Sequence, residues 1–213
     1  MAGDFNGDGK TDIGVLYNYG TNPDGTYHTA LLVFASTGTG FADPVVFWDS
    51  VTSGTGTWDW NASTVVAGDF NGDGKTDIGV LYKYFAGGTD KSTHVGLWTF
   101  TSTGTGFANP VKAWDAGTGV GNWPSAVLPS LIPPDSDKGA TANGTAVRLA
   151  QELAPPQVVV GDFNRDGKAD LATVYGGGHG SSNVFAFTAS ATGFNPPDVV
   201  GGTNVEWARA SAL

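Results

Sequence analysis

The stretch Gly3-Asp4-Phe5-Asn6-Gly7-Asp8-Gly9-Lys10-Thr11-Asp12 is followed directly by the apolar run Ile13-Gly14-Val15-Leu16-Tyr17. The same residues return in the same order at 68–82, and a variant of them stands at 161–175. An acidic, glycine-rich loop that leads into an apolar segment therefore occurs three times in one chain. Repetition of this kind indicates a repeat architecture in which each unit carries the same local site.

The loop places oxygen donors at regular positions. In the first copy Asp4, Asn6, Asp8 and Asp12 occupy loop positions 1, 3, 5 and 9, and the carbonyl of Lys10 falls at position 7. Hard oxygen donors at this spacing suit calcium, which takes about 6–8 oxygen ligands, better than magnesium, which requires stricter octahedral geometry. We therefore expect about three calcium ions per chain. The predicted metal ligands are Asp4, Asn6, Asp8, Lys10 (through its carbonyl) and Asp12; Asp69, Asn71, Asp73, Lys75 and Asp77; and Asp162, Asn164, Asp166, Lys168 and Asp170.

Three other interpretations of the loop fit its residues less well. The chain has no Cys and the loops have no His, which argues against zinc or copper. An EF-hand requires Glu at loop position 12, where Val15, Val80 and Thr173 stand instead, and a strand-forming run follows rather than a helix. Asp, Asn and Gly are also simple turn formers. The presence of all four donors in three copies favours a cation site.

These loops and the strands that follow them resemble the FG-GAP, or VCBS, repeat of integrin α-subunit propellers and many secreted bacterial proteins. The resemblance rests on the pattern Asp-x-Asn-x-Asp-Gly-x-x-Asp that begins at Asp4, Asp69 and Asp162. It implies that each loop binds calcium at the edge of a four-stranded propeller blade. The rest of each repeat shares only the rhythm of strands and turns with the family, so the resemblance says much less about the ligand.

Between the loops, apolar segments alternate with turns rich in Gly, Ser and Thr. This rhythm predicts an all-β fold made of three four-stranded propeller blades. The expected strands are Ile13–Tyr17, Tyr27–Phe34, Pro44–Trp48 and Trp58–Val66 in the first unit; Ile78–Tyr84, His94–Thr101, Val111–Trp114 and Asn122–Leu128 in the second; and Leu171–Tyr175, Val184–Thr188, Val199–Val200 and Val205–Leu213 in the third.

The repeat pattern predicts one propeller-type domain, with blade 1 at 1–66, blade 2 at 67–128 and blade 3 at 157–213. An inserted Pro-rich loop at 129–156, in which Thr145–Leu153 could form a short helix, separates the last two. Three blades cannot close a ring, because propellers have about 4–8 blades. We therefore expect the ring to be completed by a second chain, giving a six-bladed homodimer, or by missing blades of a longer repeat array.

The charge balance narrows the classes of partner that the chain could bind. The formal charge is −10, and nine of the 20 acidic residues are the loop aspartates, so three calcium ions would bring it to about −4. This balance argues against nucleic acid, whose recognition needs Lys and Arg. No apolar stretch approaches the roughly 18 residues that span a membrane. Because extracellular calcium would fill loops of modest affinity, we expect a secreted protein.

Seven tryptophans are many for a chain of 213 residues. Trp60, Trp123 and Trp207 recur at one position of the repeat, while Trp48 and Trp114 recur at another and are each followed by Asp. Large aromatic residues at fixed blade positions usually fill the interfaces between blades. The alternative is a platform on which sugars stack. For that alternative, the candidate ligand-binding residues are Trp48, Asp49, Trp60, Trp114, Asp115, Trp123 and Trp207.

Catalysis has little support in the sequence. His28, His94 and His179 fall in different units, and the chain lacks the Gly-x-Ser-x-Gly element of a nucleophile elbow. We therefore expect a noncatalytic recognition module. A carbohydrate ligand is favoured by the aromatic residues and by the resemblance, since some lectins are propellers of these repeats. A protein-binding adhesion scaffold and the noncatalytic portion of a secreted hydrolase are the alternatives.

Overall fold

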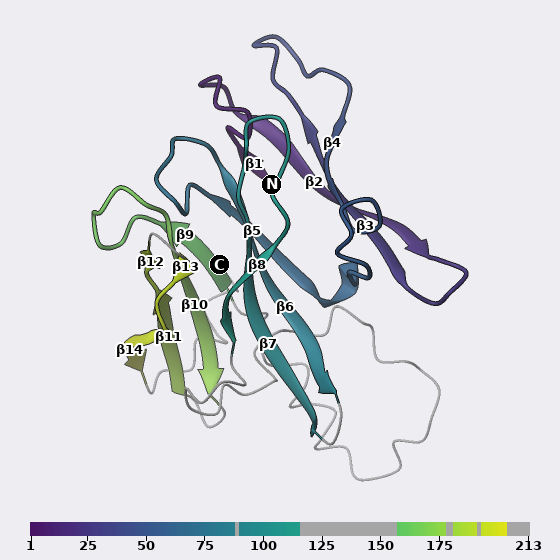
Figure 1. The fold of residues 1–213 in the computed structure, drawn as a ribbon. Helices are drawn as coiled ribbons and strands as arrows, with labels where there is room; N and C mark the ends of the chain where they lie inside the picture. The colour runs from purple at the N-terminus through teal and green to yellow at the C-terminus, as the bar shows by residue number, and fades with distance from the viewer. Residues whose placement is uncertain (88–89, 116–156, 178–180, 191–192, 204–213) are drawn as a thin grey trace, which may run out of the picture.

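The computed structural model describes residues 1–87, 90–115, 157–177, 181–190 and 193–203. Three four-stranded antiparallel sheets make up most of this part of the chain (Figure 1). In each sheet, neighbouring strands are neighbours in sequence, apart from one small insertion in the third. This is the up-and-down arrangement of propeller blades, and it confirms the all-β, four-stranded architecture.

The strands of each sheet are as follows. Blade 1 consists of β1 (Ala2–Gly3), β2 (Asp12–Thr21), β3 (Tyr27–Phe34) and β4 (Val45–Asp49). Blade 2 consists of β5 (Ser63–Gly68), β6 (Asp77–Gly87), β7 (Asp90–Phe100) and β8 (Val111–Asp115). Blade 3 consists of β9 (Gln157–Gly161), β10 (Asp170–Gly177), β11 (Ser181–Phe187) and β14 (Asp198–Thr203). The small sheet of β12 (Ala189–Ser190) and β13 (Gly193–Phe194) lies between β11 and β14 in sequence, and the 3₁₀ turn η1 (Trp60–Ala62) precedes β5.

The expected strand Trp58–Val66 does not belong to blade 1. Its strand part is β5, which pairs along its whole length with β6 in register Ser63↔Tyr82 to Gly68↔Asp77, and residues Trp60–Ala62 before it form the 3₁₀ turn. Each blade therefore begins with the strand before its loop, and blade 2 begins at Ser63, inside the range 1–66 given to blade 1. The predicted strands Asn122–Leu128 and Val205–Leu213, the predicted insertion 129–156 and the helix predicted within it lie outside the described residues.

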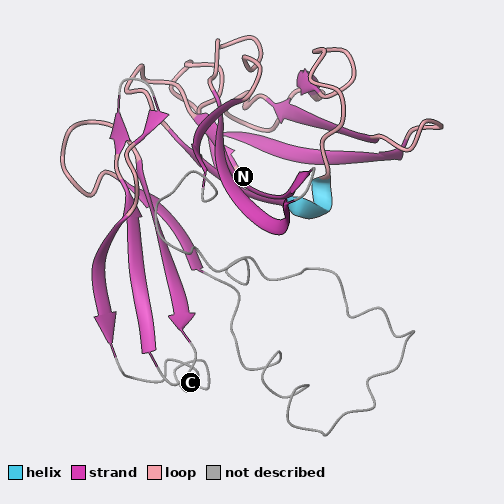
Figure 2. Ribbon diagram, turned by 60° about the horizontal axis from the view of Figure 1, so that its bottom comes forward, coloured by secondary structure: helices cyan, strands magenta, loops and turns pink. Residues whose placement is uncertain are grey.

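The first strands of the three blades lie next to one another, and the sheets fan out from them (Figure 1). β5 contacts β9, and β1 contacts β5, whereas β4 and β14 lie at the outer edges. The connecting loops gather along one end of the sheets (Figure 2). Across the described residues the three sheets do not close into a ring, and no helix among them is long and apolar enough to cross a membrane.

Apolar side chains fill the two spaces between neighbouring blades. The cluster between blades 1 and 2 contains Phe5, Leu31, Val33, Trp48, Trp58, Ile78, Val80, Phe100 and Phe107. The cluster between blades 2 and 3 contains Phe70, Leu81, Val95, Leu97, Trp114, Leu171, Phe187, Ala189 and Phe194. Because six of the nine positions in one cluster have an equivalent in the other, the blades stack by one repeated set of contacts.

A substitution at Gly68 tests how closely blades 2 and 3 must approach each other. A Cβ atom at this position would lie 2.8 Å from both Ala169 Cβ and Val160 Cγ1 of the next blade. We predict that Gly68→Ala lowers the free energy of unfolding by about 1–3 kcal/mol, the usual cost of overpacking. Gly40→Ala is the control, since a Cβ there meets nothing nearer than 3.9 Å. Chemical denaturation of the two variants should separate them, and equal losses would contradict the close approach.

Candidate metal centres and ligand pocket

In each loop the first aspartate folds onto the loop's own backbone. The Asp4 carboxylate accepts hydrogen bonds from the N–H groups of Gly7 (2.7 Å), Asp8 (3.0 Å) and Gly9 (2.8 Å). Asp69 and Asp162 accept the bonds from positions 5 and 6 of their loops at 2.8–3.1 Å. Position 1 is therefore the centre around which the loop is wound.

The oxygens at positions 3 and 5 continue this winding. Asn6 Oδ1 accepts the Asp8 N–H at 2.9 Å, and Asp8 Oδ1 accepts the Lys10 N–H at 2.9 Å. The second and third loops repeat both bonds within 0.1 Å. Since these side chains are satisfied by local backbone N–H groups, the loop has a definite shape before any ion binds.

The aspartate at position 9 has a different role from the other three donors. Asp12 is fully buried; its Oδ2 accepts the Phe5 N–H at 3.1 Å and its Oδ1 accepts the Ser36 N–H at 2.8 Å. Asp77 and Asp170 bind the equivalent pairs of N–H groups in blades 2 and 3. This carboxylate therefore ties the loop to the turn that follows the third strand of its own blade.

The donor chemistry of the loop suits a hard cation. A carboxylate or amide oxygen that accepts one N–H bond keeps a second lone pair for an ion. Lysine already supplies a positive charge at the loop: Lys10 Nζ lies 2.9 Å from Asp8 Oδ2, and the equivalent pairs in the other loops are 3.0 and 3.3 Å apart. In the described part of the chain, however, no three carboxylate or imidazole groups converge as they would around a bound metal. Calcium binding at these fifteen positions stays a prediction.

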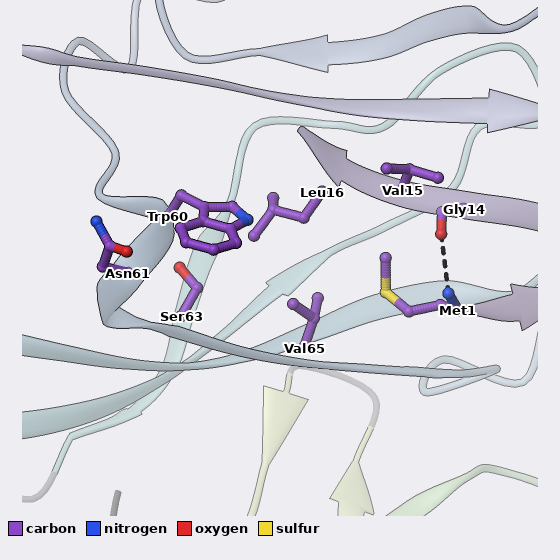
Figure 3. A pocket seen from close by; sticks show the side chains of 8 residues that line it. All are labelled: Met1, Gly14, Val15, Leu16, Trp60, Asn61, Ser63 and Val65. Carbon is purple, nitrogen blue, oxygen red and sulfur yellow. Dashed lines mark hydrogen bonds between the residues drawn. The ribbon is translucent and has the colours of Figure 1, made fainter. Parts of the chain in front are cut away.

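A pocket of about 380 Å³ opens beside the inner edge of blade 1. Figure 3 shows Trp60 over one side of it, with Asn61 and Ser63 beside the ring. Met1, Gly14, Val15, Leu16 and Val65 complete the lining. The pocket lies where β1 pairs with only two residues of β2, whereas β5 pairs with six residues of β6. Trp60 is 40% exposed as a residue, so a ligand can reach it.

Comparison with known families agrees with the geometry of the loops and blades. Residues 4–80 match the FG-GAP-like repeat, and residues 154–187 match the FG-GAP repeat. Together these two matches cover more than half of the chain. The chain belongs to the FG-GAP repeat family. None of the curated proteins matches it.

Two of the candidate tryptophans fill the space between FG-GAP blades. Trp48 is buried against Trp58 and Phe100, and its indole N–H donates to Asn109 Oδ1 of blade 2 at 3.3 Å. Trp114 is buried against Phe187 of blade 3. This burial supports the packing interpretation at these two positions. Trp123 and Trp207 lie outside the described residues.

The aspartates that follow these tryptophans are held by neighbouring side chains. Asp49 Oδ2 lies 2.8 Å from His28 Nε2, and its Oδ1 accepts the N–H groups of Val51 and Thr52. Asp115 binds the Tyr84 hydroxyl and the ammonium group of Lys112. The hydrogen bond to Asp115 raises the pKa of Lys112, so this lysine keeps its charge. Both aspartates thus join the fourth strand of a blade to the rest of its sheet.

Among the seven ligand candidates, Trp60 is the one whose surroundings in the described residues form a pocket. Sequence reasoning found Trp60 but not the apolar walls of its pocket, such as Met1, Leu16 and Val65. No spacing signal could have found them, because they come from the N-terminal residue and from β2 and β5, which belong to two different FG-GAP blades.

Asp77 gives a pH test of the second FG-GAP loop. Burial raises the pKa of its carboxyl to about 6; the Ser102 N–H opposes this rise, and the charges of Asp73 and Asp69 add to it. The folded-state pKa lies above the ordinary value of 3.8. Without a cation, ionisation of Asp77 should therefore remove stability as pH rises from about 4 through about 6, by up to about 3 kcal/mol.

The measurement is urea unfolding in chelator at about pH 4.5 and about pH 7, for the natural chain and for Asp77→Asn. The substitution removes this titration, so the natural chain should lose more stability than the variant between the two pH values. An identical change in both proteins would contradict the raised pKa.

Proposed function

We propose that this chain is a noncatalytic, secreted recognition module whose FG-GAP loops bind calcium and whose ligand is a carbohydrate. Membership of the FG-GAP family already suggests a propeller-type interaction module. The observation that carries the proposal further is the repetition of one oxygen-rich loop geometry in three blades. Each of the four oxygen-bearing side chains accepts backbone N–H groups that shape or fasten the loop, and their oxygens keep further lone pairs that a cation can use.

Calcium would be held at each loop by the side chains of positions 1, 3 and 5 and the carbonyl of position 7, with position 9 able to contribute its remaining lone pairs. The ion supplies positive charge to carboxylates that otherwise repel one another. In its absence a lysine partly fills this role, as Lys75 does beside Asp73 at 3.0 Å. Present at 100 times its dissociation constant, the ion would stabilise the fold by about 2.7 kcal/mol per site.

The proposed calcium affinity of the loops is also the reason for proposing that the protein is secreted. Sites of modest affinity fill outside cells, where calcium is abundant, and stay empty inside them. The noncatalytic assignment is supported by the hydrogen bonds of the aspartates outside the loops: Asp49 is bound by His28 and two N–H groups, and Asp115 by Tyr84 and Lys112. Carboxylates used in this way are poor candidates for acid or base catalysis.

Trp60 supports a carbohydrate as the ligand. Its exposed indole can stack on the apolar face of a pyranose, while the Asn61 side chain in the same pocket offers hydrogen-bonding groups for hydroxyls. The Ser63 hydroxyl already donates to the Asp59 carbonyl and accepts from the Trp58 indole, so it keeps one lone pair for a ligand. A protein ligand is the second candidate, because the remaining walls of the pocket are mainly aliphatic. An apolar side chain of a partner protein would fit such walls as well as a sugar would.

Asp73→Ala tests the calcium loops. We predict that it lowers the melting temperature of the protein in excess calcium, because the free energy of unfolding falls by up to about 2.7 kcal/mol when one ion is lost. In chelator the melting temperature should change much less. Asp24→Ala is the matched control, because Asp24 also accepts an N–H bond two residues ahead, from Thr26 at 2.9 Å, but lies outside the loops. Its effect should be the same with and without calcium. Equal effects of Asp73→Ala in both conditions would rule out a ligand role for this residue.

Trp60→Ala tests the ligand pocket. We predict that the natural chain is retained on a panel of immobilised glycans and that the variant loses this retention at least tenfold, while its melting temperature is little changed. Tyr19→Ala is the control for an exposed aromatic residue elsewhere on blade 1. If the natural chain binds no glycan on the panel, the carbohydrate proposal fails and the protein-binding alternative stands.

A further inference from the structure

The two interfaces between blades are built from one set of contacts. The phenylalanine at loop position 2 packs edge-on against a phenylalanine of the next blade, in the turn after its third strand. Phe5 contacts Phe107 with ring centroids 5.8 Å apart, and Phe70 contacts Phe194 at 5.2 Å. All four rings are buried. Each interface therefore joins a loop of one blade to a turn of the following blade.

A backbone hydrogen bond accompanies each phenylalanine pair. The N–H of Thr76, at position 8 of the second loop, donates to the carbonyl of Asp4 at 2.7 Å. The N–H of Ala169 donates in the same way to the carbonyl of Asp69, also at 2.7 Å. The loops of successive blades are thus linked by matching donor and acceptor groups.

The two halves of a third such interface are exposed at opposite ends of the row of blades. Phe163, at position 2 of the third loop, is 52% exposed, whereas Phe5 and Phe70 are 0% and 4% exposed. Phe41, the blade 1 equivalent of Phe107, is 51% exposed. Blade 3 therefore offers an unused loop phenylalanine, and blade 1 offers an unused turn phenylalanine.

Polar groups of the interface are also left unpaired on the exposed faces of blades 1 and 3. The N–H of Thr11 is the blade 1 equivalent of the donors Thr76 and Ala169, and the carbonyl of Asp162 is the blade 3 equivalent of the acceptors Asp4 and Asp69. Neither the Thr11 N–H nor the Asp162 carbonyl has a partner among the residues that the structure describes. The Ser102 hydroxyl donates to the Phe5 carbonyl across the first interface at 2.6 Å. Ser36 stands at the equivalent place in blade 1, and its hydroxyl donates to no group among the residues that the structure describes.

We propose that blade 3 of one chain docks on blade 1 of a second copy through this same interface. Phe163 then packs on Phe41 of the second copy, and the Asp162 carbonyl accepts its Thr11 N–H. Two copies can use both of their free faces at once, which gives a closed ring of six blades, within the range of about 4–8 known for propellers. The proposal rests on the blade interfaces alone and is independent of the ligand and of the cation.

Arg165 sets the strength of this contact. It stands at loop position 4, where the first two loops have Gly7 and Gly72, and its φ of +65° is in the left-handed region. A Cβ on Gly7 or Gly72 would lie 3.0 or 3.3 Å from the lysine stem of the next loop. In the docked pair Arg165 therefore crowds Lys10 of the second copy and repels its charge. We expect association to be weaker than the packing within the chain and to strengthen in Arg165→Gly.

The test is molar mass in solution, measured by light scattering in calcium over a range of concentrations. The natural chain should have twice the mass of one chain, and Phe163→Asp and Phe41→Asp should each have the mass of one. A mixture of these two variants should regain dimers joined by one intact interface, in which Phe41 of the first variant meets Phe163 of the second. Val51→Asp, which places a charge at an exposed position away from both faces, is the control and should dimerise normally.

Arg165→Gly should dimerise at least severalfold more tightly than the natural chain. Three results would overturn the proposal: a natural chain that stays monomeric at all concentrations, single variants that dimerise like the natural chain, or a mixture that stays monomeric. Circular dichroism of each variant separates loss of docking from loss of folding, because a folded monomer retains its β-sheet spectrum.

Discussion

The rest of the structure depends on one buried carboxylate in each blade. Asp12, Asp77 and Asp170 are fully buried, and each accepts two backbone N–H bonds, one from its own loop and one from the turn after the third strand. A buried carboxylate is costly unless it is hydrogen-bonded, so the two bonds are both necessary and specific. They fix the loop relative to the sheet in the same way three times.

This fixed position makes regular stacking possible. Once the loop is held, the phenylalanine at its second position points into the space between blades, and its first carbonyl meets the next loop. Glycine before the loop lets the next blade approach, as at Gly68, where a side chain would meet Ala169 and Val160. The local fastening of each loop thus leads to two matching interfaces, and the same reasoning leads to a third one with a second copy.

The sequence predicts the parts of this structure that are decided locally. The loops, the strands after them and the four-stranded blades follow from motif spacing and from the alternation of apolar segments and turns. The pairing partner of β5 cannot be predicted in this way, because a strand that lies between two sheets in sequence can pair with either one. The structure shows that β5 pairs with β6. The burial of Trp48 and the exposure of Trp60 also depend on neighbouring blades. Similarly, spacing identifies Asp77 as an oxygen donor but cannot tell a loop fastener from a metal ligand.

Hydrogen exchange tests most directly whether the buried carboxylates fasten the loops. The six amides that they hold are those of Phe5, Ser36, Phe70, Ser102, Phe163 and Ala189. All of them lie outside or at the very ends of the long strands. We expect these amides to exchange as slowly as amides in the centres of β3 and β7, with calcium and with chelator alike. Exchange as fast as in exposed turns would contradict it, since the loops would then not be fastened to their blades.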